Sequence, residues 1–140
     1  MNELFSVKDK VVVITGGTGV LGACIGEYLA QEGAKVVIMG RRKDEGDKIV
    51  NEILAKGGEA MFLTTDVMNE DVVRRNCEEI LAKYGKVDAL LNAAGGNMPG
   101  ATIAPDKTFF DLKVEEFSRV LDLNLIGTVI PTPVSYTHLR

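Results

Sequence analysis

The sequence has no tryptophan, one histidine and only two cysteines among its 140 residues. Cys24 and Cys77 lie too far apart in the sequence to form a metal-binding motif. We therefore expect no metal site and two buried, reduced thiols. The net charge is −4, and this balance gives no reason to expect nucleic acid or an anionic membrane as a partner.

Long hydrophobic runs are also missing. Charged residues interrupt the first ten positions, so we expect no secretory leader. The apolar stretch 120–134 is too short to span a bilayer, and it contains Asp122, Asn124 and two prolines. Because one domain usually takes roughly 100–200 residues, we expect a single domain in the reducing cytoplasm.

Short apolar runs alternate with longer segments of helical periodicity. We expect strands at residues 11–14, 36–39, 60–64 and 87–92. Helices are expected after the first three strands, ending near Gly33, Gly57 and Gly85. In the first of these helices the apolar residues that recur at helical spacing are Val20, Leu21, Cys24, Ile25, Tyr28 and Leu29. After a loop at 95–108, a fourth helix is expected over 114–121 and a fifth from near Asn124.

This alternation predicts an α/β fold. Continuous β-branched runs such as 11–14 suit parallel strands that are buried on both faces. Repeated strand–helix units with right-handed crossovers give a Rossmann-type doubly wound parallel sheet, with strand order 3-2-1-4. In this order a fourth strand with no further neighbour is an exposed sheet edge, which predicts poor solubility.

A glycine-rich turn follows the first expected strand. Residues 15–22 read Thr-Gly-Gly-Thr-Gly-Val-Leu-Gly, and Gly17, Gly19 and Gly22 satisfy the G-x-G-x-x-G pattern between a strand and a helix. Glycine permits a tight turn in which backbone N–H groups approach a pyrophosphate, and the helix N-terminus favours negative charge. Gly22 is expected to let the helix pack close to the strand. The expected cofactor contacts of this turn are Gly16, Gly17, Thr18, Gly19, Val20, Leu21 and Gly22.

The end of the second expected strand bears on the choice of cofactor. A carboxylate there would bind the ribose hydroxyls of NAD, but the sequence has Gly40, Arg41 and Arg42. A guanidinium suits a 2′-phosphate, so Arg41 favours NADP, and NAD stays open. The alternative is that Arg41 and Arg42 are surface charges flanking the next helix, whose first turn would hold Asp44 and Glu45.

These residues resemble the short-chain dehydrogenase/reductase superfamily from Lys10 to about Pro133. Beyond the glycine turn, three further motifs carry the likeness. Asp66 and Val67 follow the third strand, and the resemblance implies that this Asp contacts the adenine ring; the alternative is a loop aspartate that caps the next helix. Residues 92–95 read Asn-Ala-Ala-Gly. The resemblance implies that Asn92 supports the central sheet and that Ala93, Ala94 and Gly95 line the cofactor ribose.

A third motif is Asn124 in Asn-Leu-Ile-Gly. The resemblance implies that this Asn helps to hold a catalytic lysine and a proton-relay water; the alternative is a capping Asn between two helices. Val20 stands where the classical branch has glycine, and the turn instead matches the extended branch of sugar-nucleotide epimerases and dehydratases. The motifs at 92–95 and 124–127 favour the classical branch.

The family's chemistry is hydride transfer between nicotinamide and a small carbonyl or alcohol substrate, with a tyrosine whose pKa a nearby lysine lowers. No Tyr-x-x-x-Lys pair follows the fourth strand. We therefore expect residues 1–133 to be the cofactor-binding part of an NAD(P)-dependent oxidoreductase, inactive alone. The alternatives are a non-catalytic nucleotide sensor and an extended-branch epimerase or dehydratase. The resemblance also implies a homo-oligomer, a dimer or a tetramer.

Two local stretches lead to finer expectations. Residues 92–102, with 109–112, resemble the fructuronate reductase (D-mannonate oxidoreductase) group, which reduces a keto-sugar acid; the alternative is an idiosyncratic surface loop. Residues 134–139 resemble one reading frame of a transposase adapter used in sequencing libraries. We therefore expect 134–140 to be a non-native tail and exclude Tyr136 and His138 from the site.

Overall fold

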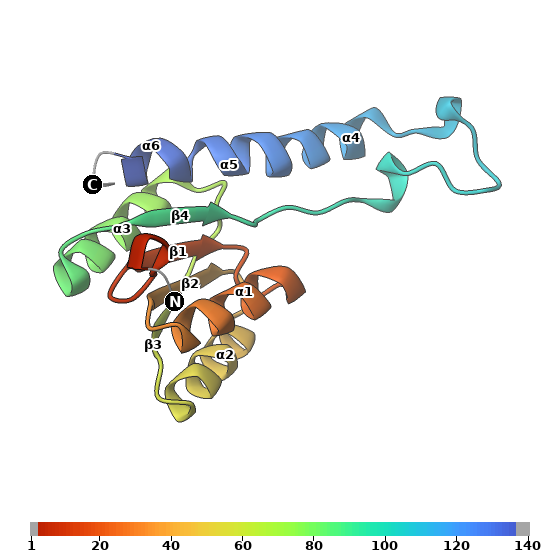
Figure 1. Ribbon diagram of the computed structural model, residues 1–140. Coiled ribbons are helices and arrows are strands. Elements are labelled where there is room, and N and C mark those ends of the chain that lie inside the picture. The colour runs from red at the N-terminus through yellow and green to blue at the C-terminus, as the bar shows by residue number, and fades with distance from the viewer. Residues whose placement is uncertain (1–2, 137–140) are drawn as a thin grey trace.

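The computed structural model describes residues 3–136, and its centre is a four-stranded parallel sheet (Figure 1). The strand order is β3-β2-β1-β4, which confirms the expected topology. The strands are β1 (Val11–Thr15), β2 (Lys35–Gly40), β3 (Glu59–Thr64) and β4 (Ala89–Asn92). Val12 of β1 pairs with Val36 of β2 on one side and with Ala89 of β4 on the other. A short 3-10 turn, Glu3–Phe5, precedes the sheet.

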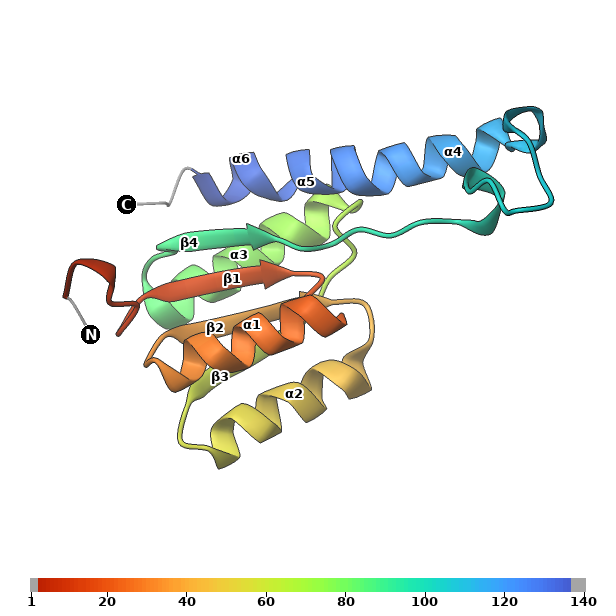
Figure 2. The ribbon, with the colours of Figure 1, turned by 45° about the vertical axis from the view of Figure 1, so that its right-hand side comes forward.

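Helices cover both faces of the sheet (Figure 2). The helices α1 (Val20–Gln31) and α2 (Lys43–Ala55) lie on one face, where Ile14 and Ile38 are buried against them. The helix α3 (Glu70–Tyr84) lies on the other face, where Ile80 packs with Val13 and Val37. Successive strand residues point to opposite faces of the sheet. Since both faces are covered here, every residue of β1 is buried. This explains the continuous apolar run that β1 shows in the sequence.

The buried side of α1 differs from its apolar pattern. The helix forms as expected, but its buried residues are Gly22, Gly26 and Ala30. A Cβ atom at Gly26 would lie 2.9 Å from Cδ1 of Ile38 on β2, so only small residues fit between helix and sheet. Most of the larger apolar side chains face outward instead, with Val20 88% exposed, whereas Leu29 is partly buried against the core. For the same reason Cys24 is exposed, and the expectation that it is buried is wrong, whereas Cys77 is buried as expected.

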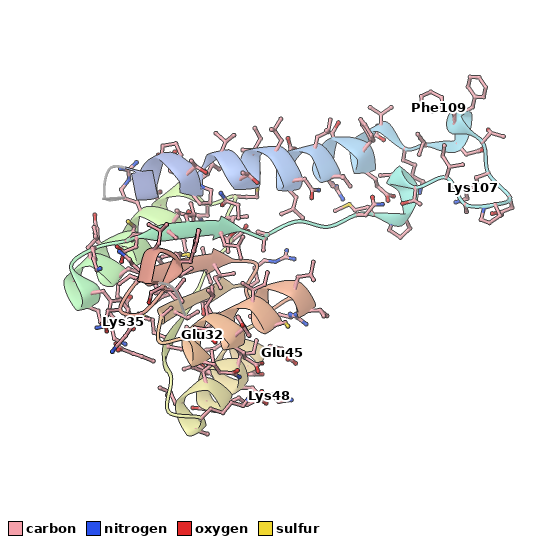
Figure 3. All side chains as sticks on the ribbon, viewed as in Figure 1. Glu32, Lys35, Glu45, Lys48, Lys107 and Phe109 are labelled. Carbon is pink, nitrogen blue, oxygen red and sulfur yellow. The ribbon has the colours of Figure 1, made fainter. Side chains whose placement is uncertain are left out.

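A long arm leaves the sheet after β4 and projects away from it (Figure 1). It contains two 3-10 turns, η2 (Pro99–Ala101) and η3 (Phe109–Asp111). Phe109 lies at its far end, pointing outward (Figure 3). The chain returns as a helical run alongside β4 and α3. The run consists of α4 (Val114–Leu121), the π-helical turn η4 (Asp122–Ile126), α5 (Gly127–Val129) and α6 (Pro131–Tyr136).

Two expected boundaries are corrected. The strand β4 begins at Ala89 rather than Val87. Just before it, a side-chain oxygen of Asp88, instead of a backbone carbonyl, accepts a hydrogen bond from the N–H of Val11 at 2.8 Å. The fifth helix begins at Gly127, three residues after Asn124, which lies within the π-helical turn.

The expected non-native tail is not tested by the fold. It falls on residues 134–140, whose side chains, including those of Tyr136 and His138, lie outside the described part of the chain. Within residues 3–136, no helix combines the length and the apolar character needed to cross a membrane.

Candidate cofactor site

A cleft of about 280 Å³ opens at the carboxyl ends of the strands. The chain runs outward from β1 to β2 and β3, and then returns to place β4 on the other side of β1. Ligands of doubly wound sheets bind at such a reversal of strand order. The cleft is lined by Gly16, Thr18, Gly19, Gly40, Arg41, Arg42, Thr65, Asp66, Val67, Ala93, Ala94, Gly95 and Leu123.

The glycine turn forms the floor of the cleft. Gly16 has a φ of +64°, and its carbonyl accepts a hydrogen bond from the N–H of Gly19 at 2.9 Å. Gly19 is the N-cap of α1 and no side chain caps this terminus. The first backbone N–H groups of α1 therefore face an anion-binding position. A Cβ atom at Gly22 would lie 2.7 Å from the Gly16 oxygen. Gly22 thus packs against the turn. It is Gly26, not Gly22, that lets the helix pack close to a strand.

The turn is joined to the loop that follows β4. The Thr15 hydroxyl oxygen accepts a hydrogen bond from the N–H of Ala94 at 3.3 Å. The N–H of Ala93 donates to the Thr15 carbonyl at 3.2 Å. Thr15 is completely buried, so these bonds hold the two loops at a fixed separation across the cleft.

Two arginines line the side of the cleft at the end of β2. A guanidinium N–H of Arg42 donates to the Thr18 carbonyl at 2.5 Å, which ties α2 to the glycine turn. A Cβ atom at Gly40 would lie 2.7 Å from the Thr18 hydroxyl oxygen, so a side chain there would crowd the turn. Asp44 and Glu45 occupy the first turn of α2, as expected.

Asp66 and Val67, in the loop after β3, also line the cleft, next to the end of β2. One Asp66 carboxylate oxygen accepts the N–H of Met68 at 3.0 Å. The cap of α3 is Asn69, whose side-chain oxygen accepts the N–H of Val72 at 3.1 Å. The alternative that Asp66 caps this helix is therefore wrong.

Asn124 is bonded both to the loop after β4 and to the last turn of α4. Its amide donates to the carbonyls of Gly96 at 2.8 Å and Val120 at 2.7 Å. The N–H of Gly96 donates back to the Asn124 side-chain oxygen at 3.2 Å. The bond to Val120 lies in the last turn of α4 and the bonds to Gly96 reach the loop, so Asn124 joins the end of this helix to the loop. Asn124 positions the end of the Asn-Ala-Ala-Gly loop.

Asn92 lies on β4, just outside the cleft lining. Its amide donates to the Thr132 hydroxyl of α6 at 3.2 Å. The Asn92 side-chain oxygen is buried and has no hydrogen-bond partner within the described part of the chain.

The structure brings most of the expected site residues together. Those lining the cleft are Gly16, Thr18, Gly19, Arg41, Asp66, Val67, Ala93, Ala94 and Gly95. Those expected there but outside its lining are Gly17, Val20, Leu21, Gly22 and Asn92. Four lining residues were not assigned a cofactor contact from the sequence, namely Gly40, Arg42, Thr65 and Leu123, although Gly40 and Arg42 were singled out beside Arg41. The first three adjoin residues that motifs selected, whereas Leu123 has no sequence signal. Among residues 3–136, no His, Cys, Asp and Glu side chains form a group that could hold a metal ion.

Residues 10–139 match the model of the short chain dehydrogenase family, and the chain belongs to this family. Among curated relatives, the uncharacterized oxidoreductase UxuB of Bacillus subtilis (strain 168) is 37% identical over 137 residues, with 92% of this chain and 49% of the relative covered. A 3beta-hydroxysteroid dehydrogenase of Mediterraneibacter gnavus is 34% identical, with 84% of this chain and 40% of the relative covered. The chain thus spans about half the length of the curated relatives it matches.

Solved structures show the same fold with cofactor bound. A candidate D-mannonate oxidoreductase from Haemophilus influenzae, with bound NAD, has a TM-score of 0.86 and 30% identity, with 94% of this chain and 51% of that chain covered. An NAD⁺-bound xylitol dehydrogenase has a TM-score of 0.84 and 26% identity, with 94% of this chain and 48% of that chain covered.

Proposed function

We propose that residues 1–133 form the dinucleotide-binding part of an NAD(P)-dependent oxidoreductase. The complete protein would transfer a hydride between nicotinamide and a carbonyl or alcohol. The observation that carries the proposal is the cleft at the reversal of strand order, with a glycine turn as its floor. No Tyr-x-x-x-Lys pair follows β4 in these 140 residues. This chain alone is therefore expected to bind cofactor without catalysing the reaction.

The cleft offers a place for each part of a dinucleotide. The uncapped N-terminus of α1 would hold the pyrophosphate. Asp66 and Val67 would hold the adenine ring, and Ala93 to Gly95 would line a ribose. The bound group supplies the hydride, and the residues of this chain bind and orient it. Asn124 would keep the ribose-lining loop in place through its bonds to Gly96.

We propose NADP as the preferred cofactor. The strand β2 ends at Gly40, which offers no carboxylate to a ribose, and Arg41 lines the cleft immediately after it. Because Arg42 is already bonded to Thr18, Arg41 is the residue proposed to bind a 2′-phosphate. Two relatives of known structure hold NAD, so the preference has to be measured.

The test is a titration of the complete protein with NADPH and NADH, followed by fluorescence of the reduced nicotinamide. Arg41→Ala is expected to weaken NADPH binding about tenfold, as suits the loss of a charge-assisted contact, and to leave NADH binding nearly unchanged. Arg75→Ala is the matched control, because Arg75 is an exposed arginine of α3 outside the cleft. A preference for NADH that Arg41→Ala does not alter would overturn the NADP assignment.

We further propose a keto-sugar acid such as fructuronate as the substrate. The support is the arm after β4, whose sequence resembles that group and which leaves the cleft at Gly95, together with the likeness to the Haemophilus protein. The complete protein should oxidise NADPH or NADH when fructuronate is added. A steroid ketone is the comparison substrate because of the Mediterraneibacter relative. Turnover of the steroid alone would contradict the assignment.

A further inference from the structure

The loop between β3 and α3 supplies one side of the cofactor cleft, through Thr65, Asp66 and Val67. It starts from β3, the outermost strand of the sheet on this side. On the sheet side, its first link is a hydrogen bond from the N–H of Thr65 to the Gly40 carbonyl at 2.9 Å. A loop that leaves an edge strand has few neighbours to fix it, so its position depends on what lies behind it.

Asn76 lies behind this loop on α3. Its side-chain amide donates one hydrogen bond to the Thr64 carbonyl at 3.0 Å and another to the Thr65 hydroxyl oxygen at 2.8 Å. The Thr65 hydroxyl in turn donates to the Leu63 carbonyl at 2.9 Å. The amide of Asn76 therefore fixes both Thr64, the last residue of β3, and Thr65, the first residue of the loop.

Burying the side chain of Asn76 would cost free energy if it made no hydrogen bonds. Asn76 is only 6% exposed, and the other buried residues of α3 are Val73, Cys77 and Ile80. Asparagine is a poor helix former, and a buried amide without partners is strongly unfavourable. Neither packing nor helix propensity explains an asparagine at this site, whereas its two donated bonds do.

We propose that Asn76 is a positioning residue that sets the affinity for the adenine half of the cofactor. It acts through Thr65, which is 2% exposed, lines the cleft and donates its N–H to the carbonyl of the neighbouring Gly40 at the end of β2. Asn76 thereby fixes the Asp66 loop in its place beside the end of β2, where the adenosine would lie. This inference rests on the proposed dinucleotide-binding function.

The test compares variants of the complete protein. Asn76→Ala removes both donors, and Asn76→Leu removes them without leaving a cavity, because leucine is of similar size. Each is expected to raise the dissociation constant for ADP-ribose about five- to tenfold, the factor for one net hydrogen bond. The KM for the reduced cofactor should rise by a similar factor, while kcat at saturating cofactor stays close to wild type. Amide hydrogen exchange should become faster at residues 65–68.

The matched control is Ile80→Val, on the same helix and also buried. The substitution lowers stability by removing one methylene. Ile80 takes no part in the hydrogen bonds of the loop. It should lower the melting temperature without changing ADP-ribose affinity. Equal shifts in Ile80→Val and Asn76→Ala, or no shift in either Asn76 variant, would overturn the positioning role. If the wild-type protein itself fails to bind ADP-ribose, both the role and the proposed function are wrong.

Discussion

A Cβ atom at Gly16 would lie 2.5 Å from the carbonyl oxygen of Ala93. Gly16 is in the turn after β1 and Ala93 in the loop after β4, so the two halves of the cleft are in contact through bare backbone. The φ of +64° at Gly16 adds a second requirement for glycine, because L-residues rarely adopt it. The glycine is therefore needed both for the turn and for the closeness of the two loops.

Gly16→Ala should abolish dinucleotide binding and destabilise the fold. The left-handed conformation costs about 1–2 kcal/mol, and the clash with backbone adds about 1–3 kcal/mol. Gly57→Ala is the control, because Gly57 has a φ of +80° and nothing within 4 Å of its Cβ position. It should show the conformational cost alone and bind cofactor normally. Urea unfolding and NADPH titration measure both effects, and equal stability losses in the two variants would contradict the close contact.

Asn124→Ala should lower kcat of the complete protein more than it changes the KM for cofactor. The change removes the bonds that hold Gly96 against the π-helical turn, and small displacements of a site loop can cost about 100-fold in rate. A loss of about 10- to 100-fold is expected. Asn51→Ala, an exposed asparagine of α2, is the control. An unchanged kcat would show that the bonded loop has no bearing on the chemistry.

The sequence predicts the sheet well because its signals are local. The run at 11–14, the glycine turn and the capping glycine Gly85 are each determined by neighbouring residues. The buried side of α1 could not be predicted, because exposed apolar residues on this helix outnumber its small buried residues, Gly22, Gly26 and Ala30. Which residues of α1 are buried depends on the distance between the helix and the sheet. The apolar periodicity of the sequence carries no information about that distance.

The site divides in the same way. Asp66 and Gly95 could be identified from the sequence because each belongs to a short motif that directly follows a strand. The hydrogen bonds that Arg42 and Asn76 make are recognised only from the folded chain, since their partners Thr18 and Thr65 lie on other elements. Long-range hydrogen bonds leave no periodic trace in a sequence, so the residues that position a site are harder to predict than those that line it.

Asp88 should make the fold sensitive to acid. Burial alone would raise the pKa of Asp88, but hydrogen bonds from Lys86 and the Val11 N–H, with the charges of Lys86 and Lys10, lower it below the usual 3.8. A carboxylate whose pKa is lowered by folding stabilises the native state above its unfolded pKa. This contribution is lost as the pH falls through the lower folded pKa.

Asp88→Asn should therefore destabilise the protein at pH 7 by about 1–2 kcal/mol, and the variant should lose less stability than wild type between neutral and acidic pH. Asp47→Asn is the control, because Asp47 pairs with Lys43 on the exposed surface of α2, where such pairs contribute about 0–1 kcal/mol. Urea unfolding across the pH range measures the difference. Parallel stability curves for wild type and Asp88→Asn would contradict the assignment of the acid-sensitive group.

The returning helical run bears an apolar stripe that should drive self-association of the 140-residue chain. Its exposed members, three or four residues apart along one side of the run, are Val114, Phe117, Leu121, Leu125 and Val129. Uncovered stripes of this kind mark interfaces or cause aggregation, and within residues 3–136 the strand β4 beside the run pairs with β1 alone. Phe117→Glu should reduce association in light scattering, whereas Ser118→Glu adds the same charge one position away from the stripe. A monodisperse wild-type chain that melts cooperatively would contradict this expectation, and equal effects of the two variants would assign the association to charge rather than to the stripe.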